Sequence, residues 1–153
     1  MTTRSLAYVT LVGLCLVASG RAEDSPKRGC RITDAVRAEP PSDRNADPFG
    51  SGPWYVNADR TMWAGADVVR MRAGSKGNKV LWIRPAGTQL TVTGRQLDAE
   101  APPAKATIPC CYPTGFQASG LAFPTAGCWE ITAVAGAHQL IFVTKVAPES
   151  EHR

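Results

Sequence analysis

The sequence predicts an all-β fold, an immunoglobulin-like β-sandwich, and three observations lead to it. After Pro53, short apolar runs are separated by glycine and proline at intervals of about ten residues, the spacing of strands in a sandwich or barrel. No run is long enough for a good helix, and the length of 153 residues fits one domain. About seven strands over roughly 95 residues match what an immunoglobulin-like sandwich requires. A small open β-barrel is the alternative fold.

The first 22 residues have the pattern of a secretory signal peptide. Arg4 precedes an apolar run over residues 6–17, and small residues follow at 18–20, which is the order of regions in such a signal. We expect cleavage after Ala22, with cleavage after Gly20 as the alternative. The apolar run is shorter than the about 20 residues that cross a bilayer core, so no stable membrane span is expected after cleavage.

Residues 23–53 are polar and are interrupted by Pro26, Pro40, Pro41 and Pro48. Such a segment buries too little apolar surface to offset the entropy of ordering it, which predicts a flexible, proline-rich leader. Cys30 is the exception, because a disulfide there would tie the leader to the domain. The sandwich is expected over residues 54–148, followed by a tail at 149–153.

Two of the expected strands form a hairpin early in the domain. Residues 67–72 and 79–84 flank a loop at 73–78 that is rich in residues tolerating positive φ. Residues 89–93 then alternate apolar and polar side chains, so Leu90 and Val92 are expected to point inward.

The last two strands are the clearest, over residues 128–134 and 139–146, joined across 135–138. Residues 140–143 are apolar on both faces, which predicts a strand lying between neighbours and not at a sheet margin. Trp82 and Trp129 lie within strands and are expected in the core, because large aromatic side chains dominate sandwich interiors.

Four motifs lie between Trp82 and Val146: WIRP at 82–85, LTVTGR at 90–95, IPCCYPTGFQ at 108–117 and FPTAGCWE at 123–130. In these motifs the chain resembles a group of uncharacterised bacterial secreted proteins and lipoproteins. The Pro-x-x-Gly turn at 124–127 is similar to the turn before the final hairpin of many bacterial immunoglobulin-like domains. The resemblance implies an immunoglobulin-like extracytoplasmic domain and transfers no activity.

Four cysteines remain after signal cleavage, namely Cys30, Cys110, Cys111 and Cys128. In the oxidising compartment of an exported protein, an even count indicates two disulfides, with three possible connectivities. Adjacent side chains of an extended chain point to opposite faces, so Cys110 and Cys111 are expected to find different partners, in preference to bonding each other. We favour a pairing of one with Cys128 and of the other with Cys30.

A soft-metal site is the sharper interpretation of these cysteines. Cys110 and Cys111, with Cys128, His138 or Met71, would offer ligands that copper or zinc prefers. Adjacent cysteines lack the two-residue spacer with which a Cys-x-x-Cys loop wraps an ion, and a redox thiol site lacks the same spacer. We therefore predict no metal and no cofactor.

Catalytic residues are not indicated by the sequence. Of the two histidines, His152 lies next to the C-terminal residue and His138 falls in the predicted hairpin loop, where a solvated turn residue is expected. The sequence contains no Gly-x-Ser-x-Gly elbow, no phosphate-binding glycine loop and no His-Glu-x-x-His helix. These observations predict that the protein is not an enzyme.

The charge pattern argues against a nucleic-acid partner. Two of the arginines behind the formal charge of +4 lie in the signal peptide, and the other basic residues are spread singly without a basic patch. Trp54, Tyr55 and Tyr112 are candidates for a surface that binds a glycan or a protein, since exposed aromatic side chains in loops commonly mark binding. The alternative is that they cover the end of the sandwich.

The leading functional prediction is an exported, non-enzymatic immunoglobulin-like domain, periplasmic or secreted, which binds or supports a protein or cell-envelope component. One alternative is a periplasmic copper, zinc or redox protein using Cys110 and Cys111. Another is a small enzyme inhibitor that presents the loop at 107–117.

Overall fold

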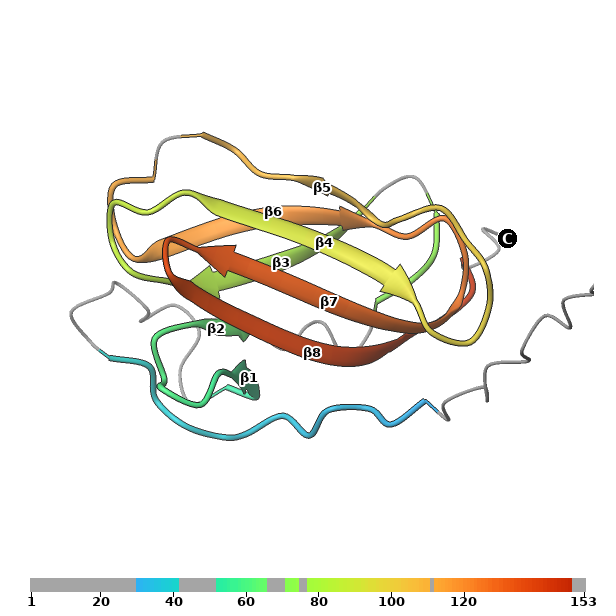
Figure 1. The fold of residues 1–153 in the computed structure, drawn as a ribbon, viewed down its shortest axis with the longest axis horizontal. Helices are drawn as coiled ribbons and strands as arrows, with labels where there is room; N and C mark the ends of the chain where they lie inside the picture. The colour runs from blue at the N-terminus through green and yellow to red at the C-terminus, as the bar shows by residue number, and fades with distance from the viewer. Residues whose placement is uncertain (1–29, 42–51, 66–70, 75–76, 111, 150–153) are drawn as a thin grey trace, which may run out of the picture.

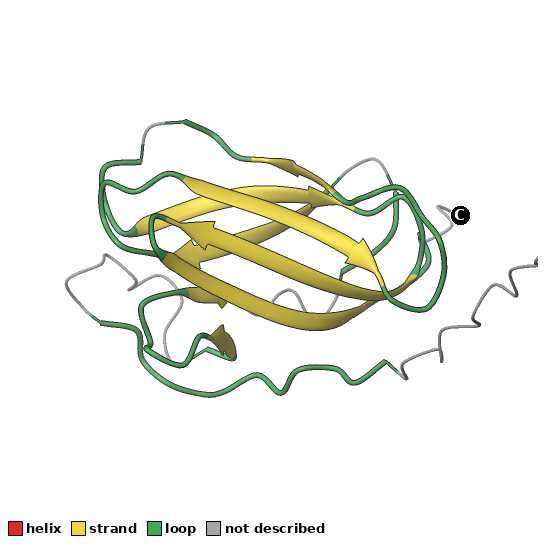
Figure 2. Cartoon of the chain, in the orientation of Figure 1, coloured by secondary structure: helices red, strands yellow, loops and turns green. Residues whose placement is uncertain are grey.

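The computed structural model describes residues 30–41, 52–65, 71–74, 77–110 and 112–149. The predicted signal peptide, the leader before Cys30 and the last four residues lie outside the described residues. The described part of the chain consists of strands and loops, without a helix (Figure 2). It therefore holds no helix that could cross a membrane. The strands are β1 (Trp54–Val56), β2 (Trp63–Gly65), β3 (Asn78–Ile83), β4 (Leu90–Gln96), β5 (Lys105–Thr107), β6 (Phe116–Ala122), β7 (Gly127–Ala135) and β8 (His138–Val146).

The strands form two antiparallel sheets that lie face to face (Figure 1). The five-stranded sheet has the order β1-β2-β3-β6-β5, and the three-stranded sheet has the order β4-β7-β8. With β1 set aside, β2-β3-β6-β5 corresponds to the A-B-E-D sheet of an immunoglobulin constant domain, and β4-β7-β8 corresponds to its C-F-G sheet. The all-β sandwich is confirmed, and the sheets do not close into a barrel.

The core lies between the sheets and follows the alternation of side chains along each strand. Leu90 and Val92 of β4 are buried, whereas Thr91 between them is exposed, as the pattern predicts. Trp82 of β3 and Trp129 of β7 are fully buried, which confirms their core position.

The final hairpin is confirmed, since β7 pairs with β8 along its whole length. The margin position of β8 was not expected: it is the last strand of its sheet, and Ile141 on its outer face is half exposed. The apolar run at 140–143 therefore does not indicate a strand between two neighbours. Its outer residues lie beside the N-terminal segment and in solvent.

The described residues of the predicted early hairpin do not pair with each other as expected. The strand expected at 79–84 exists as β3, but its neighbours are β2 and β6. Arg72 and Ala73 instead bridge to Ala147 and Phe123. The Asn78 side chain explains this, because it accepts from the backbone N–H of Arg72 and donates to the Arg72 carbonyl, at 2.8 and 2.9 Å. The first residues of the predicted strand, 67–70, lie outside the described residues.

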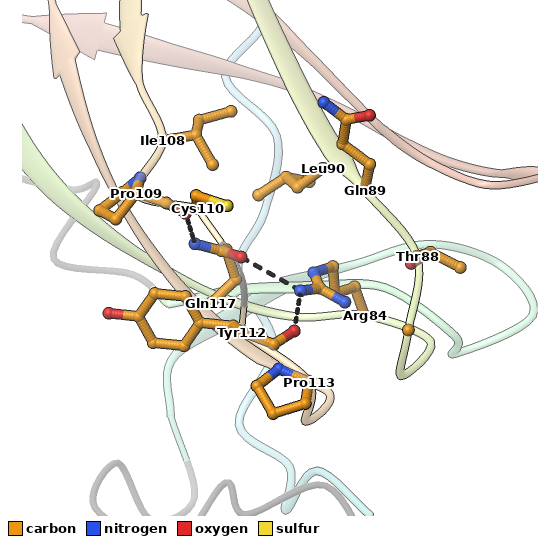
Figure 3. A pocket seen from close by; sticks show the side chains of 11 residues that line it. Arg84, Thr88, Gln89, Leu90, Ile108, Pro109, Cys110, Tyr112, Pro113 and Gln117 are labelled. Carbon is orange, nitrogen blue, oxygen red and sulfur yellow. Dashed lines mark hydrogen bonds between the residues drawn. The ribbon is translucent and has the colours of Figure 1, made fainter.

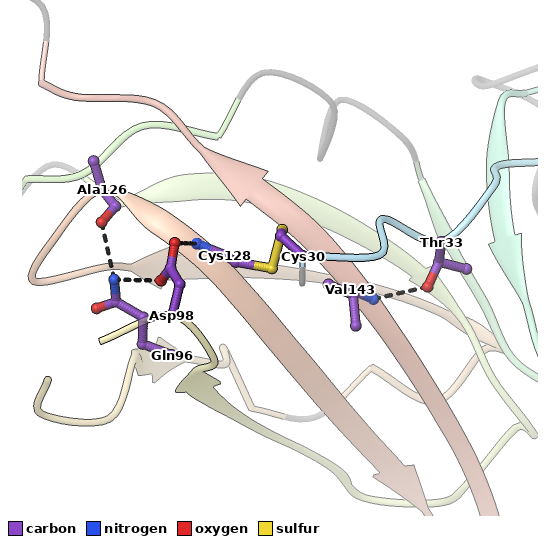
Figure 4. Close-up of a disulfide and its surroundings, with 7 residues drawn as sticks. All are labelled: Cys30, Thr33, Gln96, Asp98, Ala126, Cys128 and Val143. Atoms are coloured by element: carbon purple, nitrogen blue, oxygen red, sulfur yellow. Dashed lines mark hydrogen bonds between the residues drawn. A yellow bond between two sulfur atoms is a disulfide. The ribbon is translucent and has the colours of Figure 1, made fainter. Parts of the chain in front are cut away.

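Residues 30–36 form an N-terminal strap along the open side of the sandwich. Cys30 is bonded to Cys128 at the start of β7, as Figure 4 shows. Thr33 exchanges two hydrogen bonds with the backbone of Val143, each 2.9 Å long. Val36 then bridges to Trp54 of β1, so the strap joins the margins of the two sheets. The prediction of a flexible leader is too broad for this stretch, because a disulfide and backbone hydrogen bonds hold it.

The turn before β7 requires glycine at position 127. Gly127 has a φ of 143°, and a Cβ atom there would lie 2.3 Å from Gln96 Nε2 and 2.7 Å from Asp98 Oδ1. The space is occupied because Gln96 donates to Asp98 and to the Ala126 carbonyl (Figure 4). The Pro-x-x-Gly motif at 124–127 thus supplies the backbone conformation and the room that this polar cluster needs.

Asp98 makes the stability of the β7 end dependent on pH. Its pKa lies below the ordinary value of 3.8, chiefly because of the hydrogen bond from Gln96 and also because of the Cys128 backbone N–H. A carboxylate with a lowered pKa in the folded state stabilises the fold above its unfolded pKa, and this contribution is lost as pH falls through the folded value. We expect Asp98→Asn to lose less stability than the wild type between about pH 4 and pH 2.

Urea unfolding at a series of pH values measures this difference. Glu100→Gln is the matched control, since Glu100 is an exposed carboxylate in the same connection. Parallel pH profiles for wild type and Asp98→Asn would contradict the role of Asp98.

Candidate ligand-binding site

Three connections meet at one end of the sandwich, at the left of Figure 1: the β3–β4 loop, the β5–β6 loop and the β7–β8 turn. The corresponding end of an immunoglobulin variable domain carries the antigen-binding loops. A backbone hydrogen bond of 2.8 Å, from Arg84 N to the Gly115 carbonyl, fastens the first loop to the second. The two loops are therefore held side by side.

A pocket of about 530 Å³ lies between these loops. Such a volume suits a small ligand or one or two residues of a peptide. Its polar lining includes Arg84 and Gln117, and its apolar lining comes mainly from Leu90, Ile108, Pro109, Tyr112 and Pro113 (Figure 3). Two of the sequence motifs, WIRP at 82–85 and IPCCYPTGFQ at 108–117, contribute residues to this pocket.

Arg84 is the central polar residue of the pocket and is only 2% exposed. It follows Val80 and Trp82 at every second position, so the alternation of β3 turns it toward the inside. Its Nη1 donates to the Pro85 carbonyl at 3.1 Å. Its Nη2 donates to the Tyr112 carbonyl at 2.9 Å and to Gln117 Oε1 at 3.1 Å.

Gln117 is held in place from its other end. Its Nε2 donates to the carbonyls of Pro109 and Ala118, each at 3.0 Å, so its Oε1 faces the guanidinium (Figure 3). Gln117 is itself 2% exposed. Arg84 and Gln117 thus form a buried polar pair whose orientation is set by the backbone of the β5–β6 loop.

The charge of Arg84 has no counter-charge among the described residues. All three of its side-chain acceptors are neutral oxygens, and its buried Nε has no acceptor. Burial lowers the pKa of the guanidinium through desolvation, yet an arginine side chain keeps its proton. A buried charge without a partner is costly, so the pocket contains a cation that favours an incoming anion.

Of the predicted aromatic surface, only Tyr112 lies at this pocket. Trp54 and Tyr55 are 1% and 3% exposed, so the prediction of an exposed platform is wrong for them. The Tyr55 ring stacks on Phe142 at 4.3 Å, and burial raises the pKa of its hydroxyl. Trp54 packs edge-on against Trp63 in a second, smaller buried cluster. Tyr55 thus belongs to the core between the sheets and Trp54 to a second buried cluster, and neither ring is exposed for binding.

The cysteines pair differently from the favoured connectivity. Cys30 and Cys128 bond each other, so neither is the partner of Cys110 or Cys111, and that preference is wrong. Cys110, at the pocket, is also in a disulfide. Cys111 lies outside the described residues. The reason for the difference lies in β7, where Cys128 shares the outer face with Glu130 and is covered by the strap.

The alternative metal site loses two of its thiolates in this structure. Cys110 and Cys128 are oxidised, and the described residues contain no group of three or more histidine, cysteine, aspartate or glutamate side chains that could hold an ion. Met71 is 1% exposed and belongs to the hydrophobic core.

His138 is the first residue of β8, not a free turn residue. Its Nδ1 lies 3.0 Å from Thr61 Oγ1 and 3.2 Å from Asp59 Oδ2. A hydroxyl–histidine–carboxylate relay needs the two ring nitrogens to serve different partners, whereas here both partners meet the same nitrogen. The cluster joins the β1–β2 loop to the final hairpin and does not form that relay.

Comparison with protein-family models and with curated proteins identifies no relative of this chain. The chain matches no protein-family model and no curated protein sequence. The resemblance to bacterial secreted proteins and lipoproteins therefore stays a prediction.

Proposed function

We propose that this chain is an exported, non-enzymatic immunoglobulin-like domain that binds a protein or cell-envelope component through the loop end of its sandwich. The observation that carries the proposal is the pocket between the β3–β4 and β5–β6 loops. Binding sites combine an apolar lining with a few fixed polar groups, and this pocket has both.

The remaining features are consistent with this role. The Cys30–Cys128 disulfide suits an oxidising compartment, which supports export. The arrangement of His138 supports a non-enzymatic role, because its two polar partners share one ring nitrogen. The loops at the pocket are fastened to each other by the buried Arg84, so little ordering is needed on binding.

Site-specific photo-crosslinking in cells that produce the protein tests the proposal. A crosslinking side chain at Gln89, an exposed pocket residue, should yield a defined product with an envelope component. The same group at Thr93, exposed on the same strand but away from the pocket, is the control and should yield no such product.

Identical products at both positions, or none at position 89, would contradict the proposal. A partner that proves to be an enzyme and loses activity when this protein is added would replace it with the inhibitor alternative.

A further inference from the structure

We propose that the pocket binds the carboxylate of a ligand with an apolar body, and that Arg84 is the counter-charge. This inference rests on the proposed function and specifies the chemistry of the same site. It starts from the uncompensated guanidinium, which is more than nine-tenths buried and lines the pocket.

The hydrogen bonds of Arg84 leave donors for a ligand. A guanidinium has five N–H groups, and the three hydrogen bonds of Arg84 use one on Nη1 and both on Nη2. The Nε N–H has no acceptor, and the single bond from Nη1 leaves its second N–H over. A carboxylate oxygen is the acceptor that gives a guanidinium a charge-assisted hydrogen bond.

The other residues that line the pocket favour an apolar group next to the carboxylate of the ligand. Leu90, Ile108 and Pro113 present carbon atoms, and Tyr112 adds an aromatic ring to the pocket. Among the described residues that line the pocket there is no aspartate, no glutamate and no second cation. A dianion such as phosphate prefers several cations or donors, whereas a singly charged carboxylate on an aliphatic or aromatic group matches one guanidinium and apolar walls.

Two sources supply this chemistry: the C-terminal residue of a peptide and a small free organic acid. Both place one carboxylate next to an apolar group, and the volume of about 530 Å³ accommodates either. A peptide would extend past the exposed side chains of Gln89 and Pro109.

The test titrates the purified protein, with its disulfides intact, with matched acids and amides followed by two-dimensional amide NMR. The probes are N-acetyl-alanyl-phenylalanine and 3-phenylpropionate, each compared with its carboxamide. Both acids are expected to shift the Gln117 side-chain amide and to bind at least about tenfold more tightly than their amides, as charge-assisted bonds require. Tighter binding of the dipeptide acid than of 3-phenylpropionate identifies a peptide terminus as the source, and the reverse identifies a free acid.

Substitutions at the exposed residue Gln89 vary the charge at the pocket without touching Arg84. Gln89→Glu is expected to weaken acid binding about two- to fivefold and Gln89→Lys to strengthen it by a similar factor. Thr93→Glu is the control, placed far enough along β4 for 0.15 M salt, with a Debye length of about 8 Å, to screen its charge. Arg84→Met should abolish the preference for the acid, and the Gln89 series stands independently if that variant does not fold.

The outcomes separate this inference from the function on which it rests. Equal binding of acid and amide at the pocket overturns the carboxylate inference but leaves a binding site in place. Absence of any shift from the acids also overturns it, while crosslinking at position 89 decides the proposed function by itself.

Discussion

Removing the Cys30–Cys128 disulfide with Cys30→Ser and Cys128→Ala is expected to lower the free energy of unfolding by about 2–5 kcal/mol. The bond spans a sequence separation of 98, and in the chain-entropy model closing a loop of about 100 residues restricts the unfolded chain by about 4.7 kcal/mol. Alanine is chosen at position 128 because that side chain is 1% exposed and a serine would bury a hydroxyl.

The strap should detach in the same variant, because its remaining attachments are the hydrogen bonds of Thr33 and Val36 and the packing of Ala35. Urea unfolding measures the stability, and hydrogen exchange at the Val143 amide reports the strap directly. Thr33→Val is the matched control: it removes the acceptor of the Val143 N–H but keeps the disulfide, and should cost about 0.5–1.5 kcal/mol. An unchanged unfolding midpoint in the double variant would show that the disulfide does not stabilise the fold.

Sequence patterns were sufficient to predict the elements whose pairing partners are close along the chain. The final hairpin is an example, since its strands meet across a two-residue turn and each shows the apolar pattern of its own face. The inward direction of Leu90 and Val92 was predictable for the same reason, because alternation is a property of one strand. The core position of Trp82 and Trp129 was predictable from the size and apolarity of their side chains alone.

Pairings between distant segments were not predictable from these patterns. Ile32 and Val36 of the strap stay exposed, and the strap is held by its disulfide, by its bonds to Val143 and Trp54 and by the packing of Ala35 on the core. The short strands β1, β2 and β5 have three residues each, too few to show a period. Their strand conformation depends on partners that lie in other parts of the sequence.

The sequence analysis did not identify the candidate site because its polar residues are common types that belong to no known motif. Arg84 counts as one of several scattered surface charges when composition alone is considered, and Gln117 has no distinctive chemistry. A signal did exist, because Val80, Trp82 and Arg84 stand at alternate positions and share the inward face. Arg84 therefore extends the inward apolar face of β3, and Pro85 ends the strand directly after it. This combination indicates a buried cation at the end of a strand.

Trp82→Ala is expected to lower the free energy of unfolding by about 3–5 kcal/mol, a large part of the stability of a domain of this size. Trp82 is fully buried on β3 and its ring lies 6.3 Å from that of Phe142 on β8, so it links the two sheets. Its Nε1 also donates to the buried Ser119 Oγ at 2.8 Å. The loss therefore combines a cavity with an unpaired hydroxyl.

A double-mutant cycle separates the hydrogen bond from the packing. Ser119→Ala leaves the indole N–H without its acceptor and should cost about 1–3 kcal/mol, and Trp82→Phe leaves the serine hydroxyl unpaired. Because the double variant removes both polar groups, its cost should be smaller than the sum of the two single costs. Thr93→Ala, at an exposed position of β4, should change stability by less than about 0.5 kcal/mol. Strict additivity in urea unfolding would mean that the Trp82–Ser119 hydrogen bond, which joins β3 to β6 within one sheet, does not contribute to stability.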